Sequence, residues 1–251
     1  MDSYTINMES NGILIFTINR PEKRNAVDYK VMDGLLEAIK LCEDDKVKAL
    51  AVTGTGKAFC SGGDLSIFHG LITAEEARGM LSKMAGILYR LMMLPKPTVA
   101  VLNGTAVGGG CELASACDFR IAKRGAKAGF IQAGLGITTG WGGGTILLER
   151  LPAPKALSML ADGMILSSEE LENIGFIDRV FDGGPANACN AFLENILKKD
   201  TDVLKAYKNI LIRKWVSSSV KERIEEEVNQ CAILWESDAH HQKVAEFFNK
   251  K

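Results

Sequence analysis

Residues 106–118, AVGGGCELASACD, place three consecutive glycines and one carboxylate in a run of small and apolar residues. The glycines are Gly108, Gly109 and Gly110, and the carboxylate is Glu112. If a strand leads into this stretch and a helix begins in it, the N–H groups of the first helical turn have no intrahelical acceptor. Glycine then lets a ligand oxygen approach them closely. We therefore expect N–H donors for developing negative charge beside a group that can carry a proton.

A second glycine-containing segment, TGTGKAFCSGGD at residues 53–64, also follows a short apolar run. N–H groups from both segments could together form an oxyanion hole, where one donor typically contributes roughly 2.7–4 kcal/mol of transition-state stabilisation. The alternative is that these glycines serve only tight turns and close packing. Two segments of this type favour the oxyanion hole.

Nucleotide-binding motifs are excluded by their spacing. A phosphate P-loop needs Ser or Thr after Lys57 and glycine five positions before Gly56, where this chain has Ala58 and Ala51. A dinucleotide fingerprint starting at Gly108 needs a third glycine where Leu113 stands. The glycines therefore point to chemistry other than phosphate binding.

Glu112 has two interpretations. In the first turn of a helix its charge would suit the helix dipole, which is a purely structural role. Its neighbours Cys111, Leu113 and Ala114 instead predict burial. Burial raises the pKa of a carboxyl group, as is common for residues that transfer protons.

The surrounding pattern predicts elements that could position these residues. Apolar runs at 12–19, 49–52 and 98–102 predict strands. Helical spacing predicts one helix from the Asp28 cap to about residue 42, and another from the capping box of Thr73 and Glu76 to the prolines at 95 and 97. This alternation predicts an α/β architecture of parallel strands with helical crossovers, which collects ligand-binding residues where strand ends meet loops. Only helical patterns follow residue 200, so we expect a core at 1–199 and a helical region at 200–251.

Composition narrows the class of protein. The chain has 251 residues, 47% hydrophobic, with 30 basic and 31 acidic residues and a net charge of −1, so no overall field would attract nucleic acid or an anionic membrane. The polar N-terminus and the lack of long apolar runs predict no signal peptide or membrane span and a cytoplasmic protein. Six scattered cysteines without CxxC spacing predict reduced core thiols, and we expect no metal.

Four segments, taken in this order and spacing, resemble the enoyl-CoA hydratase/isomerase (crotonase) superfamily: NRPEKRNA, KAFCSGGDL, KPTVAVLNGTAVGGGCELASACDFRIA and GITTGWGGGT. The resemblance implies a spiral of ββα units and a C-terminal helical trimerisation region. It also implies an acyl-CoA thioester substrate, with no further cofactor, whose enolate is held by two backbone N–H groups. By motif position these belong to Gly63 and Gly109, with Glu112 as the proton-transfer residue.

The same resemblance implies contacts with the coenzyme A ester. Residues of the first loop would lie near the adenine nucleotide, residues after the second strand near the pantetheine or acyl part, and a C-terminal lysine near a phosphate of a neighbouring subunit's ligand. In that order these are Lys23, Arg24 and Ala26, then Ser61, Asp64 and Leu65, and finally Lys250. The implied assembly is a homotrimer or a hexamer.

One catalytic position departs from the hydratase pattern. Hydratases of this family use a second glutamate, whose position is occupied here by Gly134, and no acid occurs between Asp118 and Glu149. Loss of a positioned proton-transfer group typically costs about 10² to 10⁴ in rate. Ordinary hydratase activity, and isomerase activity that depends on this glutamate, are therefore not expected.

The segments FCSGGDL, ACDFR and GIT followed by WGG are most similar to the branch of ethylmalonyl-CoA decarboxylase type. That branch often has glutamate at the position of Gly134 and histidine at that of Gln132. Decarboxylation needs one returning proton, which Glu112 or water ordered by it could supply, while Trp141 shapes the acyl pocket or simply packs in the core. Three hypotheses remain: decarboxylation of a short alkylmalonyl-CoA, hydration or isomerisation by Glu112 alone, and non-catalytic acyl-CoA binding.

Overall fold

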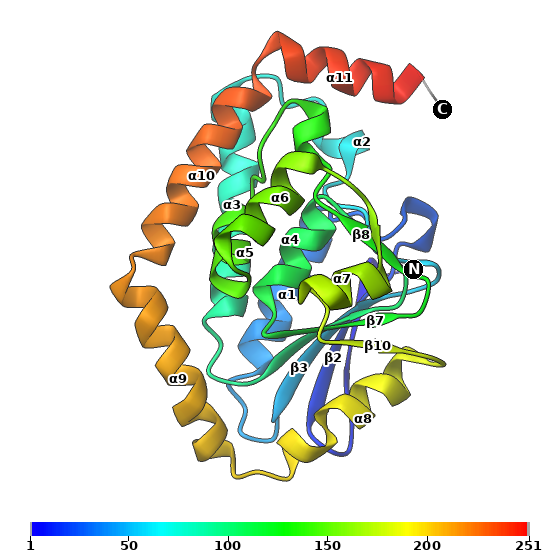
Figure 1. Ribbon diagram of the computed structural model, residues 1–251, viewed down its shortest axis with the longest axis vertical. Coiled ribbons are helices and arrows are strands. Elements are labelled where there is room, and N and C mark those ends of the chain that lie inside the picture. The colour runs from blue at the N-terminus through cyan, green and yellow to red at the C-terminus, as the bar shows by residue number, and fades with distance from the viewer. Residues whose placement is uncertain (1, 250–251) are drawn as a thin grey trace.

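Two sheets of unequal size form the frame of the protein in the computed structural model, which describes residues 2–249 (Figure 1). The larger sheet has the strand order β1-β2-β3-β5-β7-β10 and the smaller has the order β4-β6-β8-β9. The strands of the larger sheet are β1 (Tyr4–Met8), β2 (Ile13–Ile18), β3 (Ala49–Gly54), β5 (Thr98–Leu102), β7 (Phe119–Lys123) and β10 (Arg179–Phe181). Those of the smaller are β4 (Ala58–Cys60), β6 (Thr105–Val107), β8 (Lys127–Gly129) and β9 (Leu166–Ser167).

Helices follow or separate these strands. In the core they are α1 (Tyr29–Leu41), α2 (Leu65–Phe68), α3 (Ala74–Met92), α4 (Gly109–Ala116), α5 (Gly143–Arg150), α6 (Ala153–Asp162), α7 (Ser168–Ile174) and α8 (Pro185–Leu197), with short 3-10 helices η1 (Pro21–Lys23) and η2 (Gln132–Leu135). The C-terminal helices are α9 (Thr201–Ser217), α10 (Val220–Trp235) and α11 (Asp238–Asn249).

A repeated unit explains the two sheets. The pairs β3/β4, β5/β6 and β7/β8 each place their first strand in the large sheet and their second in the small one, and a helix follows each pair. Neighbouring units pair in parallel, β3 with β5 and β5 with β7, and β4 with β6 and β6 with β8. This is the crotonase-like spiral of ββα units. It brings the loops after β4 and β6 next to each other.

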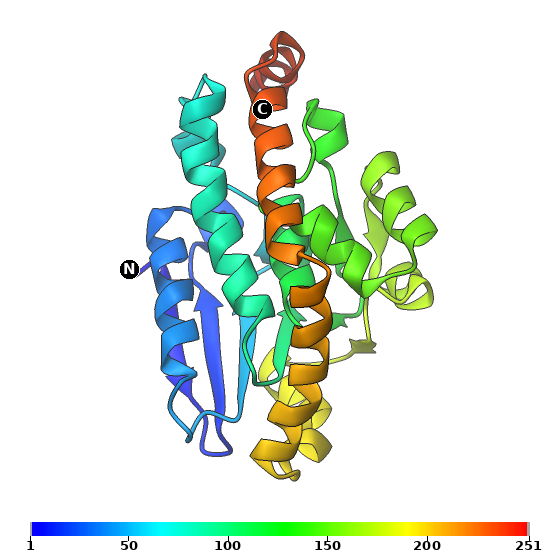
Figure 2. The same ribbon diagram turned by 90° about the vertical axis from the view of Figure 1, so that its left-hand side faces the viewer.

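Alternating side chains bury both faces of the large sheet. In β3, Leu50 and Val52 join the main core beneath the helices, whereas Ala49 and Ala51 join a second cluster with Cys189 and Leu193 of α8 on the other face. Helices α1, α3 and α10 lie side by side over the main core (Figure 2). The central strands β3 and β5 are therefore mostly apolar on both faces, as expected for strands covered on both sides.

Most of the expected elements are confirmed. The strands expected at 12–19, 49–52 and 98–102 correspond to β2, β3 and β5, and both expected helix caps are present, with the side chains of Asp28 and Thr73 accepting from the first turns. The sheets are not wholly parallel, because β1 pairs with β2 and β8 with β9 in antiparallel fashion. The very short strands of the small sheet carry too few residues for a periodic signal.

From Thr201 to Asn249 the described chain consists of helices α9, α10 and α11 joined by short turns, and α10 packs against α3 and α5 of the core. Helix α9 begins after its cap residue Asp200, whose side chain accepts from Asp202 N and Val203 N. Within residues 2–249, no helix combines the length and apolar character needed to cross a bilayer.

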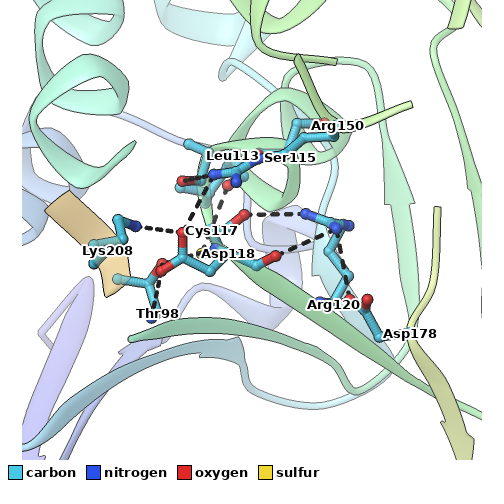
Figure 3. Close-up of polar contacts among 10 residues, drawn as sticks. Thr98, Leu113, Ser115, Cys117, Asp118, Arg120, Arg150, Asp178 and Lys208 are labelled. Carbon is cyan, nitrogen blue, oxygen red and sulfur yellow. Dashed lines mark hydrogen bonds and ion pairs between the residues drawn. The ribbon is translucent and has the colours of Figure 1, made fainter. Parts of the chain in front are cut away.

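A buried ionic cluster fixes the C-terminal end of α4 (Figure 3). Asp118, one residue beyond the helix cap, accepts from the N–H and hydroxyl of Thr98 and pairs with Lys208 of α9 and, at 3.5 Å, with Arg150 of α5. The Arg150 guanidinium also reaches the carbonyls of Ser115 and Ala116 at the C-terminal end of α4. Cations at this end suit the helix dipole, so α4 is anchored from behind by α5 and α9.

Lys208→Met should destabilise the protein, because it removes one cation from the buried Asp118. Breaking a buried ion pair typically lowers the free energy of unfolding by about 3–5 kcal/mol. We expect a loss near the lower end of this range, because Thr98 and Arg150 still contact the Asp118 carboxylate. The matched control is Lys205→Met, one helical turn earlier, where the partners Asp45 and Asp202 are almost fully exposed. That change should cost about 0.2–1 kcal/mol. Urea denaturation measures both, and equal losses would contradict the role of Lys208.

Candidate active site

Helix α4 begins where the glycines stand. Strand β6 ends at Val107, Gly108 adopts φ 55° as the cap residue, and Gly109 is the first helical residue. Among the described residues, nothing accepts from the Gly109 N–H, as expected for a first-turn donor. Glu112 lies in this first turn and is 2% exposed, which confirms the burial that its neighbours predict.

The two glycine segments are in direct contact. A Cβ at Gly62 would lie 3.2 Å from the Gly109 nitrogen, and a Cβ at Gly110 would overlap the carbonyl of Cys60. Gly63 lies in a bridge with Val27, and its N–H has no acceptor within residues 2–249. One expectation needs correction, because Gly63 precedes the Asp64 cap of α2 and is not in a helical turn. Two unpaired backbone N–H groups nevertheless stand on adjoining segments.

Four N–H groups converge on the Glu112 carboxylate. Oε2 accepts from Trp141 N at 2.8 Å and from Gly143 N at 3.0 Å. Oε1 accepts from Gln132 Nε2 at 2.9 Å and from Gly140 N at 3.4 Å. A Cβ at Gly143 would overlap the Glu112 side chain, so glycine is required for this close approach. The backbone of residues 140–143 thus forms a cradle for one side chain of α4.

Burial and, after it, the charge of the nearby Glu227 carboxylate raise the pKa of Glu112 to about 7, against the opposing effect of the backbone donors. A carboxyl group with this pKa is about half protonated near pH 7. It can therefore give or take a proton under ordinary conditions, which an exposed glutamate does far less readily.

Trp141 joins the carboxylate to the glycines. Its N–H donates to Glu112, while its indole, 4% exposed, lies so close to Gly109 that a Cβ there would overlap the ring. A Cβ at Gly63 would lie 3.5 Å from the same ring. The side chain therefore packs in the core beside both unpaired N–H groups, and its role in shaping an acyl pocket stays a prediction.

Gln132 is a site residue that the sequence showed only as a departure from related chains. Its side chain is 7% exposed, and its Nε2 donates to Glu112, whereas its buried Oε1 has no partner among residues 2–249. A half turn of the amide exchanges the two atoms, so this side chain can donate to a carboxylate or accept from a carboxylic acid. Gln132 thus suits both protonation states of Glu112.

The first loop lies against the second glycine segment. Val27 N donates to Gly62 O at 2.8 Å, and the Ser61 hydroxyl donates to the carbonyl of Lys23 at 3.3 Å. Lys23 and Arg24 are exposed and Ala26 is buried. The residues expected near the nucleotide and those expected near the pantetheine are therefore brought together.

Two residues that sequence reasoning missed organise this junction. The Arg20 guanidinium donates to the Ala26 carbonyl at 2.6 Å and to Asp64 at 2.7 Å. Asn25 is fully buried and donates to the carbonyls of Thr55 and Ala58. Asp64 also caps α2 through Ser66, and its hydrogen bonds to Ser66 and Arg20 lower its pKa despite the opposing effect of burial. Its observed contacts are structural, and Leu65, partly exposed, follows it.

The remaining expected positions are Gly134, Lys250 and the six cysteines. Gly134 lies in η2, is exposed, and has no atom within 4 Å of where its Cβ would be. Lys250 lies outside the described residues. All six cysteines are free and buried, and burial raises the pKa of the Cys60 thiol to about 12. Within residues 2–249, no three His, Cys, Asp or Glu side chains gather in a metal-binding group.

Comparisons with known proteins agree with this architecture. A sequence profile of the enoyl-CoA hydratase/isomerase family matches residues 8–251. Ethylmalonyl-CoA decarboxylase of Bos taurus is 32% identical over 252 residues, which cover 97% of this chain and 81% of that protein. The Homo sapiens protein of the same name is 31% identical, covering 99% and 83%. The crystal structure of an enoyl-CoA hydratase from Bacillus halodurans superposes with a TM-score of 0.88 at 23% identity, covering 97% and 99% of the two chains.

Gly109→Ala should destabilise the protein by about 1–3 kcal/mol, because the added methyl group overlaps the Trp141 indole. Gly134→Ala is the matched control, since its Cβ enters open space, and it should be nearly neutral. Trp141→Leu should cost less in the Gly109→Ala background than alone. Urea denaturation of the three single variants and the double variant measures this coupling, and additive losses would contradict the packing of Trp141 on Gly109.

Proposed function

Because this chain belongs to the enoyl-CoA hydratase/isomerase family, whose members act on acyl-CoA thioesters, we propose that it decarboxylates a short alkylmalonyl-CoA. One observation carries the proposal: a single buried carboxyl group that can hold a proton near pH 7 lies one helical turn from Gly109, whose N–H is unpaired. The similarity to proteins named ethylmalonyl-CoA decarboxylase supports the same reaction.

The proposed reaction breaks the bond between the α-carbon and the free carboxylate of the substrate. Carbon dioxide leaves, and the electron pair of that bond forms a thioester enolate. The enolate oxygen accepts from the N–H groups of Gly63 and Gly109, which need not reorganise as charge develops. Glu112 in its acid form gives its proton to the α-carbon, directly or through water, and recovers one from solvent. The products are a saturated acyl-CoA and carbon dioxide.

The surroundings of Glu112 suit a proton that comes and goes. Backbone N–H groups of the cradle stabilise the carboxylate after transfer, whereas burial favours the acid before it. The buried Oε1 of Gln132 has no partner and can accept from the acid once the amide turns. Trp141, beside the two unpaired N–H groups, would bound the acyl group and limit its size.

Hydration or isomerisation by Glu112 alone is the alternative. Addition of water to a double bond needs one group to activate water and another to manage the α-proton. The position that would hold the second acid is Gly134, which has no side chain and faces open space. A catalytically idle acyl-CoA binder is a further alternative, which the retained carboxyl group with its raised pKa disfavours.

The coenzyme A contacts and the assembly belong to the same proposal. Lys23, Arg24 and Ala26 would bind the nucleotide end, and Ser61, Asp64 and Leu65 the pantetheine or acyl part. Lys250 would reach a phosphate of a neighbouring subunit's ligand. Helix α9 exposes an apolar stripe at helical spacing, formed by Val203, Tyr207, Ile210 and Leu211, which supports packing against a second copy in a homotrimer or a pair of trimers.

A panel of thioesters separates these functions. The purified protein is incubated with alkylmalonyl-CoA esters and with enoyl-CoA esters, and the products are identified by mass spectrometry. Loss of carbon dioxide from the first group supports the proposal. Addition of water or a moved double bond in the second group supports the alternative, and binding without product supports the idle binder.

Glu112→Gln should lower kcat for the alkylmalonyl-CoA ester at least about tenfold and leave ester binding within a few fold, because a proton donor acts in the transition state. In the wild-type protein kcat should fall as pH rises through about 7, since the acid form of Glu112 is lost there. The Glu112→Gln variant should not show this fall of kcat with rising pH. An unchanged kcat would reduce Glu112 to a structural carboxylate.

Gly134→Glu should raise hydration of crotonyl-CoA above the wild-type rate, because it adds the missing second carboxylate in open space. The rate should stay well below that of a competent hydratase, since a misplacement of about 1 Å can cost roughly 10²-fold. It should also slow decarboxylation, because a second anion opposes the substrate carboxylate. Gly134→Gln is the matched uncharged control. A wild-type hydration rate of about 10 s⁻¹ or more would favour the hydratase.

A further inference from the structure

Two carboxylates from distant parts of the chain divide the N–H groups of one loop. Glu112 of α4 accepts from Trp141 N and Gly143 N. Glu227 of α10 accepts from the next two, Gly144 N at 3.0 Å and Thr145 N at 2.7 Å. Three of these donors lie in the first turn of α5, where N–H groups have no intrahelical acceptor, and Trp141 directly precedes the Gly142 cap. The second carboxylate comes from the C-terminal helices, 115 positions after the first.

Glu227 holds this loop at both ends. Its Oε1 also accepts from the hydroxyl of Thr139 at 2.6 Å, and the same hydroxyl accepts from Gly144 N at 3.1 Å. Residues 139 and 144–145 are thereby tied to one side chain, and the cradle at 140–143 lies between them. A second contact comes from the same helix, because the Cys231 thiol lies 3.3 Å from the Thr138 carbonyl. Helix α10 thus sets the shape of the segment that holds Glu112.

We propose that Glu227 is a positioning residue for Glu112: it shapes the 139–145 loop so that Trp141 N and Gly143 N meet the Glu112 carboxyl group, and it places a negative charge beside that group. The role in turnover rests on the proposed function of Glu112 as proton donor. The placement of Glu112 by Glu227 does not, and it can be measured without any substrate.

The charge of Glu227 acts in a defined direction. It disfavours a second anion nearby and so raises the pKa of Glu112. The other titratable groups around the pair are Cys111 of α4 and Cys231 of α10, and burial raises the pKa of both thiols, that of Cys231 to about 12. Arg223, one turn before Glu227, is bound to Glu149 of α5 at 2.8 Å. Glu227 is therefore the carboxylate that tunes Glu112.

A purely structural role is the competing explanation. Glu227 could serve only to dock α10 on α5, in which case its loss would lower stability and leave the protonation of Glu112 unchanged. Charge and shape can be separated by two variants. Glu227→Gln removes the charge at nearly constant size, and Thr139→Val removes one tie of the loop at constant charge. Glu226→Gln is the matched control, because the Glu226 side chain is exposed and makes no hydrogen bond or ion pair with the loop within residues 2–249.

The experiment follows the carboxyl carbon chemical shift of Glu112 against pH by NMR in protein carrying labelled glutamate. The Glu112 signal is assigned by its absence from the spectrum of Glu112→Gln. Glu227→Gln should move the titration midpoint of Glu112 clearly below that of the wild-type protein, and Glu226→Gln should not. In the alkylmalonyl-CoA assay, the high-pH limb of kcat should move by the same amount. Thr139→Val should lower kcat by about tenfold with KM within about twofold and a smaller shift of the midpoint, whereas Thr139→Ser should restore kcat.

The outcomes are distinguishable. If Glu227→Gln and Glu226→Gln give the same Glu112 midpoint, the proposal is overturned, whichever reaction the protein performs. It is also overturned if Thr139→Val lowers the melting temperature but leaves kcat unchanged. If no ester is decarboxylated while the midpoint moves as expected, the proposed function fails and the positioning role stands. If Glu227→Gln does not fold, the kcat and KM of Thr139→Val and Thr139→Ser decide.

Discussion

The arrangement of the site depends on burying one carboxyl group against backbone N–H groups. Glu112 is almost fully withdrawn from water, and its charged form is tolerated because the loop at 140–143 and Gln132 supply donors. The loop also depends on its own sequence, because it can approach Glu112 this closely only with glycine at position 143. Desolvation and hydrogen bonding oppose each other here, and the balance leaves the group able to exchange a proton near neutral pH.

The spiral of ββα units brings the donors together. Successive units place the ends of β4 and β6 side by side, so that Gly62 lies against the Gly109 nitrogen. Gly110 lies too close to the Cys60 carbonyl for a larger residue to fit. Backbone donors held in this way belong to the fold and keep their direction when charge develops on a ligand. The Trp141 indole then closes the space beside them.

Helix α4 is held at both ends. At its start Glu112 is bound to the loop before α5, and at its rear the Asp118 cluster ties it to α5 and α9. Both attachments involve the C-terminal helices. Glu227 of α10 binds the loop that contacts the start of α4, and Lys208 of α9 pairs with Asp118 beyond the C-terminal end of α4. The helical region therefore contributes to the geometry of the core site as well as to any surface it presents to another copy.

The sequence by itself determined the elements with strong local signals and the family to which the chain belongs. The caps at Asp28 and Thr73, the buried strands and the burial of Glu112 all follow from neighbouring residues. The tertiary structure alone decided the short strands of the small sheet, the partners of Glu112 in the 140–143 loop and the contacts of Glu227 with that loop. Three-residue strands carry no periodicity, and the glycines of the 140–143 loop do not show which carboxylate their N–H groups will meet. Glu227 belongs to an acidic run, which is typical of a solvated helix face. Only the packing of α10 on α5 turns the Glu227 carboxylate toward the core.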